Sequence, residues 1–118
     1  MAATRITPIT PTSPYLLEST TPQLNTVTAS ASDATNGNVI TLAKDILLRL
    51  ENTTVGSETV TITSYPEGYG RLATITAFSI PTLAVVNRRF TRFGWGNGSG
   101  DLEIITSDAG ITVEAYEI

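Results

Sequence analysis

The chain of 118 residues contains no cysteine and no histidine. Without cysteine, disulfide bonds and thiolate metal sites are excluded. Without histidine, the commonest general base and the commonest ligand of transition metals are missing, so Ser-His-Asp and Cys-His catalytic sites cannot form. We therefore expect a protein that is not an enzyme and that needs neither a cofactor nor a metal.

Positive charge and long apolar runs are also scarce. Seven Lys and Arg residues face 11 Asp and Glu residues, which gives a net charge of −4. Such an acidic chain lacks the basic surface that non-specific nucleic-acid binding needs. No apolar run approaches the roughly 18 residues of a membrane helix, and the first residues lack the apolar core of a secretory signal. We expect no nucleic acid and no membrane as partner, and synthesis in a cytoplasm.

Residues 1–25 differ in composition from the rest of the chain. Prolines at four positions stand among Thr and Ser, and each removes a backbone donor, so we predict an extended N-terminal arm outside the sheet. The arm is either a loose terminus or a segment that becomes ordered against a partner. Its candidate partner-binding residues are Ile6, Ile9, Tyr15, Leu16 and Leu17.

Residues 45–64 carry the clearest strand pattern. Ile46, Leu48 and Leu50 alternate with residues of the opposite face, and after a connection that contains Gly56 the alternation resumes. β-Branched threonines, which suit a pleated surface, fill the outward positions of the second run. A glycine-containing connection of this length predicts an antiparallel hairpin.

Further period-two runs, separated by turn residues such as Asn36-Gly37, lie at residues 26–32, 39–42, 72–80, 83–90, 101–106 and 111–118. About eight short antiparallel strands without a convincing helix predict an all-β domain over residues 26–118, either a single β-sandwich or a jelly-roll-like small barrel. The predicted core residues are Ile46, Leu48, Leu50, Val60, Ile62, Ile75, Val85, Leu102, Ile104 and Val113.

A cluster of arginines and aromatic residues lies between residues 88 and 95. It can stack on sugars or bases, or anchor a protein interface. Alternatively, Phe90 and Trp95 fill the end of the sandwich and the arginine stems lie across them. Arg88, Arg92 and Phe93 are the candidate partner-binding residues of this cluster.

Two other patterns have weaker functional interpretations. Asp101 and Glu103 share one face of a predicted strand and could serve acid/base chemistry or bind Ca²⁺, although a solvated strand face is the more common explanation. The glycine-rich loop at residues 94–100 lacks the lysine of a phosphate-binding loop.

Several short motifs resemble those of small tailed-phage virion proteins that look like head decoration (cement) proteins. The resemblance covers roughly residues 36–118. The motifs are Asn36-Gly37-Asn38, LLRLENTT at 47–54, TVTITS at 59–64, Gly68-Tyr69-Gly70-Arg71 and Phe93-Gly94-Trp95.

The resemblance implies a non-enzymatic protein of the virion that binds the outer surface of the major capsid protein lattice, often as a homotrimer at three-fold sites, and stabilises the head. One alternative is a carbohydrate-binding module of a tail or fibre, with Trp95, Tyr69 and Tyr65 as stacking platforms. Another is a head-completion or tail structural component.

Overall fold

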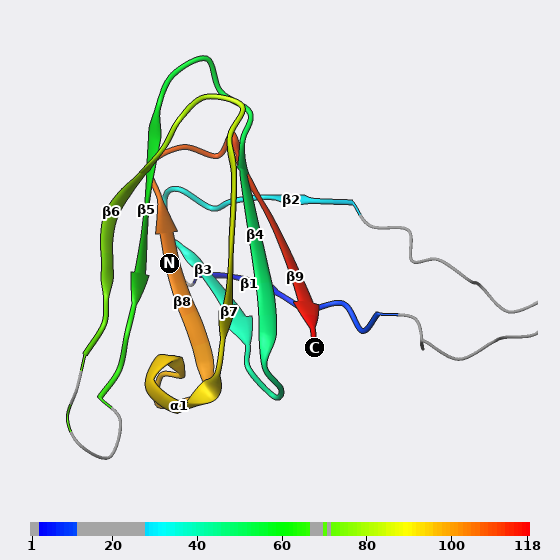
Figure 1. Ribbon diagram of the computed structural model, residues 1–118, viewed down its shortest axis with the longest axis vertical. Coiled ribbons are helices and arrows are strands. Elements are labelled where there is room, and N and C mark those ends of the chain that lie inside the picture. Colours follow the sequence, from blue (N-terminus) through cyan, green and yellow to red (C-terminus); the bar gives the residue numbers. More distant parts are fainter. Residues whose placement is uncertain (1–2, 12–27, 67–69, 71) are drawn as a thin grey trace, which may run out of the picture.

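The computed structural model describes residues 3–11, 28–66, 70 and 72–118, and this part of the chain forms two stacked β-sheets (Figure 1). The alternating runs of the sequence become strands because each run can bury one face against the opposite sheet. The elements are β1 (Thr4–Ile6), β2 (Ser30–Ala31), β3 (Asn38–Thr41), β4 (Ile46–Asn52), β5 (Glu58–Thr63), β6 (Ile75–Ile80), β7 (Val85–Phe90), the short helical turn α1 (Arg92–Trp95), β8 (Asp101–Thr106) and β9 (Ile111–Glu117).

Strands β2 to β9 follow the path of a jelly roll. One sheet has the order β2-β9-β4-β7, and the other has the order β3-β8-β5-β6, with β1 added beyond β3. Neighbours within each set of four are antiparallel, whereas β1 pairs in parallel with β3. The prediction of an all-β sandwich is therefore confirmed.

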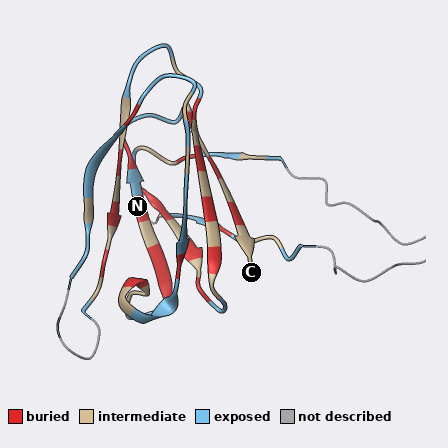
Figure 2. Cartoon of the chain, in the orientation of Figure 1, coloured by how far each residue is buried: buried red, intermediate tan, exposed pale blue. Residues whose placement is uncertain are grey.

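The core lies between the two sheets, and it consists mainly of the alternating apolar residues that the sequence indicated (Figure 2). Ile75 is only partly buried, and the prediction for Val85 is wrong because its side chain is 43 % exposed. Val85 pairs with Glu51 on the outer face of the sheet, whereas Val86 pairs with the buried Leu50. The predicted core residues that are buried are Ile46, Leu48, Leu50, Val60, Ile62, Leu102, Ile104 and Val113.

The predicted hairpin of residues 45–64 is also wrong. β4 pairs with β7 and β9, and β5 pairs with β6 and β8, so the connection between them crosses from one sheet to the other. Asn52, fully buried at the end of β4, holds this crossing. Its side-chain amide donates to the carbonyls of Gly56 at 2.9 Å and Ile80 at 2.8 Å, and its Oδ1 accepts from the backbone N–H of Thr54 at 2.9 Å.

The first strand belongs to the sheet, although the sequence predicted that residues 1–25 lie outside it. Thr4–Ile6 contains no proline, so its N–H groups remain available, and the Thr4 N–H donates to the carbonyl of Gly37 at 3.0 Å. The buried amide of Asn38 donates to the Thr4 carbonyl at 3.1 Å, and the Ile6 side chain joins the core. The part of the predicted arm at residues 12–25 lies outside the described residues.

Candidate functional site

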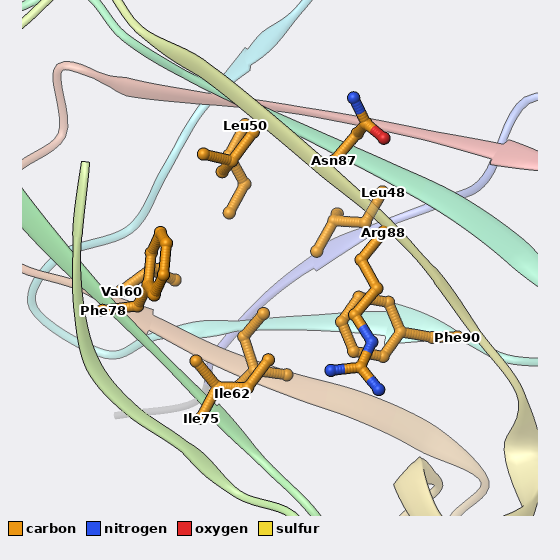
Figure 3. A pocket seen from close by; sticks show the side chains of 10 residues that line it. Leu48, Leu50, Val60, Ile62, Ile75, Phe78, Asn87, Arg88 and Phe90 are labelled. Atoms are coloured by element: carbon orange, nitrogen blue, oxygen red, sulfur yellow. The ribbon is translucent and has the colours of Figure 1, made fainter. Parts of the chain in front are cut away.

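A cleft of about 220 Å³ opens between the two sheets on the side where β6 and β7 form the sheet edges. Side chains from both sheets point into it (Figure 3). All the lining residues except Asn87 and Arg88 are apolar, so the hydrophobic core reaches the surface here. The lining residues are Leu48, Leu50, Val60, Ile62, Ile75, Phe78, Val86, Asn87, Arg88 and Phe90.

The sequences of the two edge strands explain why the cleft stays open. Its floor comes from β4 and β5, whose inward residues are large and aliphatic. β6 has four consecutive exposed residues, Thr76 to Ser79, and β7 places the polar Arg88 on the inward face. These two strands therefore cover the floor less completely than the central strands cover one another.

An irregularity in β6 contributes to the opening. The register between β5 and β6 shifts between Val60 and Ile62, and Ala77 has a φ of +48°, which is uncommon for a residue with a Cβ. Its N–H donates to the hydroxyl of Thr61 at 2.9 Å. Such bulges bend a strand and increase its twist. Phe78 consequently lines the cleft while its side chain remains 51 % exposed.

The backbones of β6 and β7 are open on their outer sides. Within the part of the chain that the structure describes, each has a single strand neighbour, β5 for β6 and β4 for β7. An edge of this kind offers free N–H and C=O groups to another chain unless charge, proline or a covering segment blocks it. β6, with the sequence ITAFSI, contains neither a charged residue nor a proline.

Arg88 supplies a fixed positive charge to the cleft. Its guanidinium carbon lies 5.4 Å from the ring centroid of Phe90 and 5.0 Å from that of Trp95. The two rings meet edge to face at 4.8 Å. Cation–π contacts of this kind hold the guanidinium in place and leave its N–H groups able to bind a carboxylate. The interpretation that Phe90 and Trp95 fill the end of the sandwich is confirmed, since both are buried.

The two other candidate residues of the cluster, Arg92 and Phe93, lie in α1. Phe93 is 67 % exposed. The Arg92 side chain packs against the glycine-rich loop, where a Cβ on Gly100 would lie 2.8 Å from the guanidinium. Gly100 has a φ of +79°, so the backbone conformation favours glycine at this position. Arg88 and Phe90 are therefore the members of this cluster that line the cleft.

The candidate residues of the predicted arm have different positions. Ile6 is buried in the core and is not available to a partner. Ile9 forms a parallel bridge to Tyr116 of β9, and its carbonyl accepts from the N–H of Glu117 at 2.7 Å. Tyr15, Leu16 and Leu17 lie outside the described residues.

The acidic pair of β8 has structural partners. Asp101 is nearly buried and accepts two hydrogen bonds from the Arg5 guanidinium, at 2.7 and 3.0 Å, which hold the pKa of its carboxyl below the usual range. Glu103 accepts a hydrogen bond from the side-chain amide of Asn97 at 2.7 Å. No group of three or more Asp or Glu side chains suited to a metal ion occurs among the described residues.

Sequence reasoning missed the cleft and three of its lining residues, Phe78, Val86 and Asn87. One signal was present. Arg88 lies on the inward face of the strand that follows the uncharged run ITAFSI in the sequence. A charged residue on an inward face is unusual in a closed core. That signal becomes visible once the paired positions Leu50 and Val86 show which face of β7 is inward.

Comparison with known proteins gives no relative from which a function could be transferred. No family model matches the chain, and neither a curated protein nor a solved structure is significantly similar to it. In the described part of the chain, no helix has the length and apolar character needed to cross a membrane.

Proposed function

We propose that this protein is a non-enzymatic structural protein of a tailed-phage virion, a decoration (cement) protein that binds the outer surface of the major capsid protein lattice and stabilises the head. Two observations support the proposal. Residues 36–118 resemble such proteins in sequence motifs, and the strand order is that of a jelly roll, an architecture found in viral capsid proteins and in lectins.

The open edge at β6 and β7 is the observation that carries the proposal. A protein that works alone would leave part of its core, two strand backbones and the exposed Phe78 in contact with water. A subunit of an assembly covers such a surface with a neighbouring chain. The site thus fits a protein that works by binding other protein chains.

The alternative of a carbohydrate-binding module has less support. Trp95, the strongest candidate for stacking on a sugar, is buried against Phe90 and Arg88. The pKa of Tyr65 is raised by a hydrogen bond to Glu103, so its hydroxyl already has a protein partner. Tyr69 lies outside the described residues. A head-completion or tail component shares the argument from the open edge, and its position in the particle distinguishes it.

The test is to add the purified protein to phage heads assembled without it and to image them by electron microscopy. We expect regular additional density on the outer surface of the head, at three-fold sites of the lattice. Density at the portal vertex or on the tail would favour the head-completion or tail alternative. Absence of any bound protein would contradict the proposal.

A matched pair of variants shows whether the cleft takes part. Phe78→Asp introduces a charge at the mouth of the cleft, where the native side chain is half exposed. Val55→Asp introduces the same charge at a fully exposed position in the connection between β4 and β5. We expect the first variant to occupy fewer sites on the head and the second to bind as the native protein does.

A further inference from the structure

We propose that the cleft between β6 and β7 receives residues 15–18 of a second copy of this chain, so that copies join head to tail. This inference deepens the proposed function and rests on it, because it names the partner of the same protein-binding cleft.

The cleft suits a short apolar segment followed by a carboxylate. Its volume of about 220 Å³ is below the roughly 300–1,000 Å³ of small-molecule pockets, so it holds a few side chains rather than a ligand. Its wall is apolar, and Arg88 supplies a positive charge. The sequence at residues 15–18 is Tyr-Leu-Leu-Glu, three apolar side chains and then one acid.

The geometry separates this segment from the cleft of its own chain. Tyr15 lies four residues beyond Pro11, so at most about 14 Å of extended chain joins them. Ile9 pairs with β9, and three strand spacings of about 4.8 Å already separate it from β7 within the sheet. Figure 1 shows the blue segment after β1 running past β9, away from β7. To reach the cleft of its own chain, the segment would have to turn back and cross the width of the sheet, so the geometry favours the cleft of a second copy.

Residues 3–11, which lead into the segment, and the cleft lie on opposite sides of the sandwich. β1 and β2 form the sheet edges on one side, and β6 and β7 form the edges on the other. A contact between two different surfaces of identical chains is heterologous, and it produces either a closed ring or an open fibre. A ring of three copies would match the three-fold symmetry that the proposed function expects.

Cysteine cross-linking tests this contact, since the native chain contains no cysteine. Leu17→Cys is made in one chain and Phe78→Cys in another, and the two purified proteins are mixed and oxidised. We expect a covalent dimer of the two chains. The control mixes Leu17→Cys with Val55→Cys, whose position is fully exposed and does not line the cleft, and we expect at least tenfold less dimer.

The chain that carries both Leu17→Cys and Phe78→Cys should form covalent multimers. An intramolecular disulfide in a monomer would overturn the proposal, because it would place the arm in its own cleft. Equal yields of dimer from the Phe78→Cys chain and from the Val55→Cys chain would overturn it too.

A measurement without cysteine gives independent support. Leu16→Asp with Leu17→Asp should convert the protein to a monomer in sedimentation velocity, whereas the matched variant Thr20→Asp with Thr21→Asp should keep the native mass. A native protein that is monomeric at every concentration contradicts the inference. It leaves the proposed function standing if that monomer still binds heads.

Discussion

Two buried asparagines hold the backbone in place where the chain enters or leaves a strand. Asn52 ties the crossing between the sheets to the end of β6, and Asn38 ties β1 to the turn before β3 through Thr4 and Asp33. Both side chains are almost completely buried and have hydrogen-bond partners. Amides with so many partners specify the path of the backbone more strictly than an apolar residue of similar size.

We expect Asn52→Ala to destabilise the protein strongly. The substitution removes the hydrogen bonds to the buried Ile80 carbonyl and the partly buried Thr54 N–H, and a buried group left unpaired costs about 1–3 kcal/mol. Urea unfolding measures the loss in the free energy of unfolding. Asn87→Ala, on the exposed edge strand, is the control and should change it by less than about 0.5 kcal/mol. Similar losses in both variants would contradict this role of Asn52.

A second prediction compares two aliphatic residues on the paired strands β4 and β7. Leu48→Ala should lower the free energy of unfolding by about 2–5 kcal/mol, because it removes buried methyl groups and leaves a cavity. Val85→Ala should cost well under half of that amount, since the Val85 side chain is substantially exposed. If the two losses are equal, the assignment of Val85 to the outer face of β7 is incorrect.

The third prediction concerns the stability of the folded protein at acidic pH. Because the Arg5 guanidinium lowers the pKa of Asp101 in the folded protein, the unfolded chain binds that proton more readily. The contribution of Asp101 to stability is complete above the ordinary aspartate pKa of about 3.9 and is lost as the pH falls through the lowered pKa. Melting temperatures from pH 7 to pH 2 should therefore fall less steeply for Arg5→Met than for the native protein. An unchanged slope would contradict the role of this ion pair.

At the scale of the element, β1 is the clearest case in which one segment serves the whole domain. Its three residues contribute a core side chain, Ile6, and the Arg5 partner of Asp101. We expect a chain that starts at Asn25 to melt at a lower temperature than the full chain. Replacing residues 12–24 by a flexible linker of the same length leaves β1 in place and should restore most of the difference. Equal melting of the native and the truncated chain would mean that β1 contributes nothing.

The sequence predicted which residues of most strands are inward, but it did not predict which sheet each strand joins. Alternation reports that Leu48 and Val60 both face a core, and this holds equally for a hairpin and for strands on opposite sides of a sandwich. The proline-rich composition around Thr4–Ile6 concealed a strand, because the prolines follow the segment and do not interrupt it. Val85 was misplaced because β7 is an edge strand, where polar and apolar residues occur on both faces.

At the scale of the whole molecule, the two sides of the jelly roll are not covered equally. The edge at β1 and β2 is extended by Ile9, which pairs with β9, whereas the edge at β6 and β7 opens onto the core. The cleft could not be predicted from the sequence, since it depends on the bulge between Val60 and Ile62 and on which strands become edges. A molecule with one extended side and one open side is suited to joining copies in a single direction.

Hydrogen exchange along β6 and β7 tests most directly whether the open edge binds a protein chain. We compare the native protein with Leu16→Asp/Leu17→Asp at the same high concentration, with the amides between β5 and β8 as an internal control for the fold. We expect amides on the outer sides of β6 and β7 to exchange more slowly in the native protein, while the control amides exchange equally in both. Equal exchange along β6 and β7 in the two proteins would contradict the binding of a protein chain at this edge.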